Sequence, residues 1–209
     1  MPLAAHHIAG LYAVTPDESD TGVLVAKAGA ALAGGAKLLQ YRNKTAAAAL
    51  RSEQAAALQT LCRRHRAPLI INDHLELALE IDADGLHLGG EDGSIAAARA
   101  LLGPHKILGV SCYNALDKAV RAWREGADYV AFGSFFTSGV KPGAVRAPFG
   151  LLAEAKREIP VPAVAIGGIT VQNAPQLIAA GADAVAVISA VFAATEVEAA
   201  ARQFARLFT

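Results

Sequence analysis

The chain has 209 residues, of which 54% are hydrophobic, and its 19 Lys and Arg residues balance 19 Asp and Glu residues. This length suits one large domain or two small ones, and the apolar content excludes a disordered chain. A formal net charge of zero provides no global field that would recruit nucleic acid or an anionic membrane.

Targeting signals, apolar runs and cysteine usage together predict the cellular location of the protein. The first residues lack the basic and apolar pattern of a secretory signal, and no apolar run approaches the length of a membrane span. The two cysteines, Cys62 and Cys112, have no metal-type spacing and suit small buried or helix-surface residues in a reducing compartment. We therefore expect a cytoplasmic protein that has neither nucleic acid nor a membrane as partner.

Short apolar segments alternate with longer, alanine-rich segments along the chain, as strands alternate with helices in α/β proteins. The predicted strands are residues 8–15, 38–41, 69–72, 85–88, 108–111, 129–132, 163–166 and 184–188. Helices are expected between them, for example over 22–33, 46–64, 115–125 and 174–180. Eight strands with eight crossovers predict one (β/α)₈ barrel domain, the TIM barrel with its closed parallel sheet, over residues 1–209.

A local repeat favours this barrel. Residues 82–89, 126–133 and 181–188 each carry a small residue, a turn with an Asp and the start of a strand. Gly126 and Gly181, which lead two of these units, suit the left-handed residue that follows a helix. The main alternative is an open doubly wound sheet. Its dinucleotide-binding version is disfavoured because no Gly-x-Gly-x-x-Gly follows the first strand.

Polar residues gather where several predicted strands end, which is where (β/α)₈ barrels carry their active sites. Period-two alternation places Leu38, Gln40, Arg42 and Lys44 on one face of the second strand. The polar residues after later strands are Asn72, Asp73, Asp92, Ser111 and Lys141.

Two carboxylates at neighbouring strand ends, Asp73 and Asp92, suit Mg²⁺, which prefers oxygen ligands and often shares them with substrate phosphates. Each aspartate has an alternative role as a helix cap. Asp73 could cap the helix over 75–80, and Asp92 could cap the helix near Ile95, although Ser94 is better placed there.

Three cations, Arg42, Lys44 and Lys141, could bind phosphate oxygens through charge-assisted hydrogen bonds. Their alternative is a solvated surface charge. Gln40 and Asn72 could hydrogen-bond a polar ring, or they could satisfy backbone groups at the barrel mouth.

Ser111 and His87, which lie on two of the predicted strands, are expected to act as hydrogen-bonding groups. Ser111 has no His or acid near it in the sequence, so we interpret it as a hydrogen-bond donor and not a nucleophile. His87 is expected to be a hydrogen-bonded interior residue.

A second anion site is predicted across the mouth. Gly167 and Gly168 follow the seventh strand, and Ile188 and Ser189 follow the eighth into a short helix. Glycines allow close approach to the backbone, and loops 7 and 8 commonly bind phosphate in this fold. The long irregular segment 134–148 is expected to be a substrate loop.

Taken together, these segments resemble the thiamine-phosphate synthase family, also called thiamine-phosphate pyrophosphorylase, over nearly the full chain. The similar segments are residues 12–15, 40–44, 72–73, 87–92, 109–111, 126–133, 141, 165–169 and 187–189. The resemblance implies a (β/α)₈ fold and one reaction. In it, the diphosphate ester of 4-amino-5-hydroxymethyl-2-methylpyrimidine is coupled to a carboxylated or simple hydroxyethylthiazole phosphate, giving thiamine phosphate and diphosphate.

The resemblance also implies roles for individual residues. Asp73 and Asp92 would hold the Mg²⁺ cofactor. The pyrimidine diphosphate would be bound by Gln40, Tyr41, Arg42, Asn43, Lys44, Asn72, Ser111 and Lys141. The thiazole phosphate would be bound by Ser138, Gly139, Val140, Gly168, Ile188 and Ser189. The catalytic set would be Arg42, Lys44, Ser111 and Lys141, and no general base is required because the attacking nitrogen carries no proton.

The sequence departs from the family pattern at Val140, where a second hydroxyl is usual, and at Gly90, where Gln or Arg is common. One alternative function is a thiazole phosphate tautomerase of the same fold, which would need a histidine where this chain has Tyr113. A second is a non-catalytic barrel that senses thiazole phosphate. We expect small-molecule substrates as partners, and a homodimer stays open as the assembly.

Overall fold

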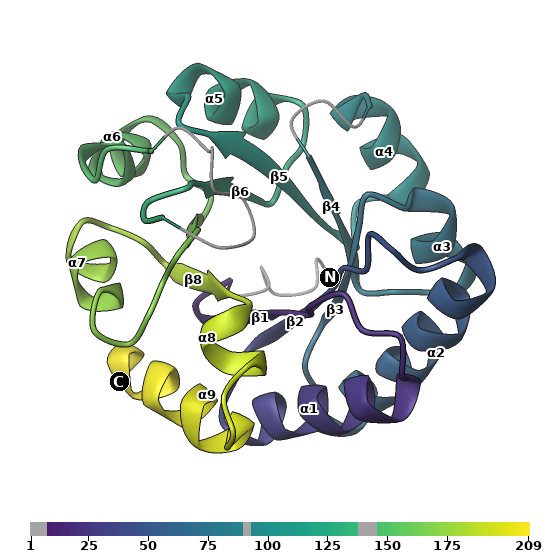
Figure 1. Cartoon of the computed structure of the whole chain (residues 1–209). Helices are drawn as coiled ribbons and strands as arrows, with labels where there is room; N and C mark the ends of the chain where they lie inside the picture. The colour runs from purple at the N-terminus through teal and green to yellow at the C-terminus, as the bar shows by residue number, and fades with distance from the viewer. Residues whose placement is uncertain (1–7, 90–92, 138–145) are drawn as a thin grey trace.

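The computed structural model describes residues 8–89, 93–137 and 146–209, which form a closed barrel of parallel strands surrounded by helices (Figure 1). The strands are β1 (Gly10–Val14), β2 (Leu38–Tyr41), β3 (Leu69–Asn72), β4 (Gly85–Leu88), β5 (Ile107–Tyr113), β6 (Tyr129–Phe132), β7 (Ala163–Ile166) and β8 (Ala184–Val187). They follow one another around the barrel in chain order, and β8 closes it by pairing with β1. The predicted (β/α)₈ fold is confirmed.

The helices cover the outside of the barrel. They are α1 (Thr21–Ala33), α2 (Ala48–His65), α3 (Leu75–Glu80), α4 (Ile95–Leu102), α5 (Leu116–Arg124), α6 (Gly150–Glu158), α7 (Ala174–Ala179), α8 (Ser189–Phe192) and α9 (Val197–Ala205), with the 3₁₀ turn η1 (Arg206–Phe208). In the ring, α9 packs beside α1 (Figure 1). Among the described helices, none is both long and apolar enough to cross a membrane.

Several elements differ from their predicted bounds by one or two residues at an end; β1, for example, spans Gly10–Val14 and not residues 8–15. Local reasons are visible for two of them. Helix α2 begins at Ala48 and not at residue 46, because Asn43 Oδ1 accepts hydrogen bonds from the backbone N–H groups of Thr45 and Ala46. Asn side chains form such turns readily, and the turn delays the helix. Strand β5 continues past residue 111 to Tyr113, with a shift of register against β6 at that end.

The repeated aspartate turns join adjacent strands. Asp84 Oδ2 accepts a hydrogen bond from Leu69 N at 2.9 Å, which ties the start of β4 to the start of β3. Asp128 accepts the equivalent bond from Leu108 N, the second residue of β5, at 2.7 Å, and Asp183 accepts one from Ala163 N, the first residue of β7, at 2.8 Å. Each bond satisfies a backbone donor that the start of a strand would otherwise leave unpaired. The aspartate of the predicted repeat therefore has a structural role, because it hydrogen-bonds neighbouring strands together.

Alternation along the strands creates two apolar layers. On β1, Leu11 and Ala13 belong to the layer between sheet and helices, whereas Tyr12 and Val14 belong to the barrel interior. Tyr12 and Tyr129 fill the interior together with small and aliphatic side chains from the other strands. Their hydroxyl groups need polar partners inside the barrel, and this requirement shapes the site above them.

Candidate active site

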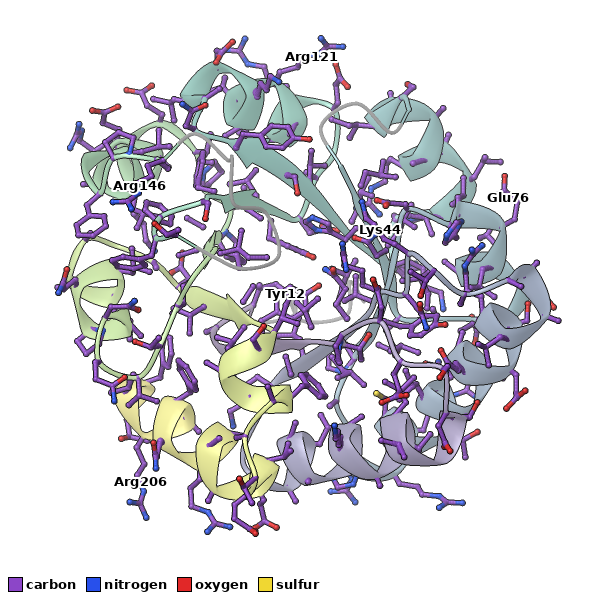
Figure 2. The ribbon with its side chains drawn as sticks, viewed as in Figure 1. Tyr12, Lys44, Glu76, Arg121, Arg146 and Arg206 are labelled. Atoms are coloured by element: carbon purple, nitrogen blue, oxygen red, sulfur yellow. The ribbon has the colours of Figure 1, made fainter. Side chains whose placement is uncertain are left out.

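A cleft of about 210 Å³ opens where β2 and β3 end beside α2. It is lined by Tyr41, Asn43, Lys44, Arg51, Asn72, Asp73 and His74. The structure thus brings together several predicted site residues that come from two neighbouring strand ends. Figure 2 shows Lys44 inside the ring of helices, whereas Glu76 and Arg121 lie at the outer rim.

The segment after β2 is held in place by groups that follow β1. Thr15 Oγ1 accepts a hydrogen bond from Arg42 N at 2.9 Å and donates to Arg42 O at 3.0 Å. Asp17 Oδ1 accepts a bond from Lys44 N at 2.9 Å and lies 3.4 Å from Arg42 Nη1. Thr15 and Asp17 therefore form a clamp that fixes the backbone of Arg42 and Lys44 at the mouth, and the sequence reasoning did not include it. The signal for it was an acid just after the first strand.

Tyr41 and Asn43 lie between the barrel and α2, and both are buried. Tyr41 Oη donates to Gln54 Oε1 at 2.8 Å, and Asn43 Nδ2 donates to the same oxygen at 3.1 Å and to Glu18 O at 2.7 Å. Burial raises the pKa of Tyr41 to about 12. Both side chains therefore support the wall of the cleft.

Asp73 has a left-handed backbone conformation with φ 62°, which Asp tolerates better than most residues. Asn72 Nδ2 donates to Asp73 Oδ2 at 2.6 Å. The N-cap position of α3 is His74, whose side chain makes no capping hydrogen bond. Asp73 therefore does not occupy the N-cap position that the alternative role required. The capping role expected for Ser94 is confirmed, since its Oγ accepts from Ala97 N at 3.2 Å.

Arg51 reaches the cleft from the first turns of α2 and was missed because it does not follow a strand. Its Nη2 donates to Ala46 O at 2.7 Å, while its buried Nε has no hydrogen-bond partner in the described structure. The pKa of the nearby His74 is lowered first by burial and then by the Arg51 charge. Arg51 therefore adds positive charge to a cleft that already contains Lys44.

A chain of hydrogen bonds runs through the barrel interior beside this cleft. Gln40 Nε2 donates to Tyr12 Oη at 2.9 Å, and Tyr12 Oη lies 2.8 Å from Tyr129 Oη. Tyr129 Oη lies 2.9 Å from His87 Nδ1, and His87 Nε2 lies 2.9 Å from Ser111 Oγ. Burial raises the pKa of both tyrosines well above the ordinary value, so both phenols keep their protons. The expected interior role of His87 is confirmed.

The predicted second site lies across the mouth, at the ends of the adjacent strands β7 and β8. Gly167 and Gly168 have φ 104° and 65°, in the left-handed region that favours glycine. A Cβ on Gly168 would lie 2.5 Å from Thr137 O, and one on Gly167 would lie 2.0 Å from Ser134 Oγ. The absence of side chains at these two glycines therefore leaves room for the segment that follows β6 to pack against them. Ile188 is the N-cap residue of α8, which begins at Ser189 and has only 4 residues.

Several predicted site residues lie outside the described residues: Asp92 and the run Ser138, Gly139, Val140 and Lys141. Gly90 lies outside them as well. Within the described ranges, no group of three or more His, Cys, Asp or Glu side chains is placed to hold a metal ion.

A larger hollow, of about 610 Å³, lies on the outer surface beside α5. Its lining includes Val120, Arg124 and Glu158, together with Arg121, whose Nε donates to Glu125 Oε1 at 2.7 Å. Figure 2 places Arg121 at the rim of the molecule, far from the barrel mouth. In (β/α)₈ barrels the chemistry takes place at the carboxyl ends of the strands, so the smaller cleft is the candidate active site.

The fold and the cleft define a (β/α)₈ barrel protein whose mouth carries cations, amides and a carboxylate, a composition suited to phosphorylated ligands. A family model described as thiamine monophosphate synthase matches residues 11–191. The chain belongs to this family.

Relatives named thiamine-phosphate synthase are similar over nearly their whole length. The protein from Methylobacillus flagellatus is 60% identical over 201 residues, which cover 96% of each chain. The protein from Nitrosomonas eutropha is 53% identical over 207 residues, covering 99% of this chain and 98% of the relative. The solved structure of thiamine phosphate pyrophosphorylase from Pyrococcus furiosus superimposes with a TM-score of 0.86 at 34% identity, covering 97% and 96% of the two chains.

Proposed function

We propose that the protein is a thiamine-phosphate synthase, a transferase that couples 4-amino-2-methyl-5-(diphosphomethyl)pyrimidine to a thiazole phosphate and releases diphosphate. Family membership and the relatives that are named for this activity support the proposal. The structural observation that carries it is the cleft at the ends of β2 and β3, where Lys44, Asn72 and Asp73 meet.

The diphosphate would bind at this cleft. Arg42 and Lys44 would contact its oxygens, with Lys141 from the segment after β6 and Asn72 from the end of β3. The clamp formed by Thr15 and Asp17 supports this role, because it orders the backbone from which both cations extend, and Asp17 also contacts the Arg42 guanidinium. A backbone that is ordered in advance loses little freedom on binding, which raises affinity.

The carboxylate of Asp73 fits a Mg²⁺ ion in chemical character, since Mg²⁺ takes oxygen ligands and is commonly held by one or two carboxylates plus phosphate oxygens. Asp73 and Asp92 would hold it. When bound, Mg²⁺ would neutralise part of the negative charge on the diphosphate. The cationic neighbours Lys44 and Arg51 suit a ligand that brings several negative charges of its own.

The reaction would begin with cleavage of the C–O bond between the pyrimidine methylene and the diphosphate. The aminopyrimidine ring can delocalise the positive charge that results, and the thiazole nitrogen then captures the methylene carbon. Arg42, Lys44 and Lys141 would stabilise the departing diphosphate, while Gln40 and Ser111 would orient the pyrimidine diphosphate. Removal of one such preorganised donor typically lowers kcat by about 10²–10³-fold.

The thiazole phosphate would bind at the ends of β7 and β8. Gly168, Ile188 and Ser189 would offer backbone and hydroxyl donors there, together with Ser138, Gly139 and Val140. The proximity of the two strand ends supports this arrangement. It places the thiazole across the mouth from the diphosphate, as the transfer of a methylene group between them requires.

The activity is tested by diphosphate release and thiamine phosphate formation in the presence of Mg²⁺, with each substrate alone and with both. Formation of product only when both are present supports the synthase. Isomerisation of the thiazole phosphate alone would indicate a tautomerase, and binding without turnover would indicate a sensing barrel.

Asp73→Ala tests the metal site. We expect the coupling rate to fall by about 10²-fold or more, since charge stabilisation of the diphosphate is lost, while the circular dichroism spectrum stays unchanged. Glu76→Ala removes an exposed carboxylate nearby on α3 and serves as the matched control. A normal coupling rate in Asp73→Ala would refute this role.

We also propose a cytoplasmic location, and a homodimer stays a prediction. Cell fractionation tests the first, and light scattering of the purified protein tests the second. A monomeric mass in solution would overturn the dimer without affecting the proposed reaction.

A further inference from the structure

The hydrogen-bonded chain in the barrel interior joins residues from five strands. Gln40 lies on β2, Tyr12 on β1, Tyr129 on β6, His87 on β4 and Ser111 on β5. All but Ser111 are buried, and Ser111 is half-buried at the mouth. The rings of His87 and Tyr129 stack with their centroids 5.6 Å apart. The imidazole is therefore held by packing on one side and by hydrogen bonds at both nitrogens.

Each hydroxyl group has one hydrogen to donate, and this limit decides which group donates in each hydrogen bond of the interior chain. Gln40 Nε2 donates to Tyr12 Oη, so the Tyr12 hydrogen is available to Tyr129. The Tyr129 hydrogen is then available to His87 Nδ1, which must accept it. A neutral imidazole that accepts at Nδ1 carries its hydrogen on Nε2. His87 Nε2 therefore donates to Ser111 Oγ.

The opposite direction is less favourable. If Ser111 donated to His87 and His87 donated to Tyr129, the hydroxyl of Tyr12 would receive two hydrogen bonds and its own hydrogen would lack an acceptor among these groups. An unsatisfied buried donor is costly. A phenol is also a better donor than an imidazole N–H, and an imidazole nitrogen is a better acceptor than a phenol oxygen.

We propose that His87 is a positioning residue that, by donating Nε2–H to Ser111 Oγ, reserves the Ser111 hydroxyl hydrogen for an acceptor atom of the pyrimidine diphosphate. This inference rests on the proposed function, which makes Ser111 a substrate contact. Without His87, the hydroxyl could rotate and accept a bond as readily as donate one. A chain of aligned hydrogen bonds also polarises its last donor, which strengthens the bond to an anionic or ring-nitrogen acceptor.

The tautomer of His87 can be measured independently of activity. In ¹⁵N-labelled protein, two-bond ¹H–¹⁵N correlation spectra distinguish the Nε2–H from the Nδ1–H form, and His87→Gln identifies the signals of this residue. We expect the Nε2–H form, and in Tyr129→Phe we expect loss of its dominance because the donor to Nδ1 is removed. A dominant Nδ1–H form in the unmodified protein would overturn the proposal.

A kinetic double-mutant cycle tests the link to Ser111. We expect His87→Leu to lower kcat about tenfold with a small change in KM, and His87→Gln, which can still offer an N–H, to recover part of that loss. In the Ser111→Ala background, we expect His87→Leu to have less than about a twofold effect. His105→Leu changes an exposed histidine and is the matched control.

The outcomes separate this proposal from the proposed function. Equal losses from His87→Leu in both backgrounds would mean that His87 has only a structural role. Where His87→Leu does not fold, Tyr129→Phe replaces it in the cycle with the same criterion. An inactive unmodified protein would refute the synthase, whereas the tautomer measurement would still decide the direction of the hydrogen-bonded chain.

Discussion

Gly109 should be nearly irreplaceable because of where Tyr129 lies. The two residues are in register on β5 and β6. A Cβ added to Gly109 would lie 2.0 Å from Tyr129 Cζ and 2.3 Å from its Oη, far inside van der Waals contact. The ring is fully buried and hydrogen-bonded to Tyr12 and His87, so it cannot move aside without losing both bonds.

The cost of Gly109→Ala follows from these contacts. Overpacking a well-packed interior costs about 1–3 kcal/mol, and two lost hydrogen bonds add about 1 kcal/mol each. The free energy of unfolding should therefore fall by about 3–5 kcal/mol. For a chain of this size that corresponds to a decrease in Tm of about 6–20 °C.

Thermal and urea unfolding measure this change. Gly150→Ala is the control, because a Cβ at Gly150 would meet no atom within 4 Å, and its effect should stay within about 1 kcal/mol. Tyr129→Leu should relieve the clash, so the double variant should be less destabilised than the sum of the two single variants. A Tm for Gly109→Ala within about 2 °C of the unmodified protein would refute the reasoning.

Two further predictions concern the clamp and the thiols. Asp17→Ala removes the acceptor for Lys44 N, so KM for the pyrimidine diphosphate should rise about tenfold while Tm changes little; an unchanged KM would contradict the clamp. Burial raises the pKa of the Cys62 and Cys112 thiols to about 12 each. Since unfolded thiols ionise at lower pH, the free energy of unfolding should fall as pH rises from about 9 towards 12, and iodoacetamide should label these cysteines only on unfolding. Rapid labelling of the folded protein would contradict their burial.

The sequence alone was sufficient to predict the strands and helices and to place many polar residues at the strand ends. Apolar runs of strand length are local signals, and so is the small residue and aspartate before a strand. Both recur along the chain and together predict the barrel. Once the barrel is predicted, the carboxyl ends of β2 and β3 must lie side by side, so the proximity of Lys44, Asn72 and Asp73 follows from topology.

Other features could not be predicted from the sequence because they join residues that are distant along the chain. Asp17 binds the backbone of Lys44, and Arg51 enters the cleft from a helix face. The sequence reasoning found no partner for Ser111, yet His87 on the adjacent strand lies 2.9 Å away. Local pattern carries no information about which side chains meet across a barrel.

Gly167 and Gly168, which follow β7, also show what the sequence can predict and what only the tertiary structure reveals. Their sequence predicted a phosphate site that approaches the backbone closely, and their left-handed conformation is one that glycine adopts readily. Only the tertiary structure reveals that the segment after β6 occupies the space that side chains would need there. The sequence by itself determined the alternation of strands and helices, because hydrogen bonding and apolar periodicity are local. The tertiary structure decided the partners of the interior polar groups, because closure of the barrel brings together strands that are far apart in the chain.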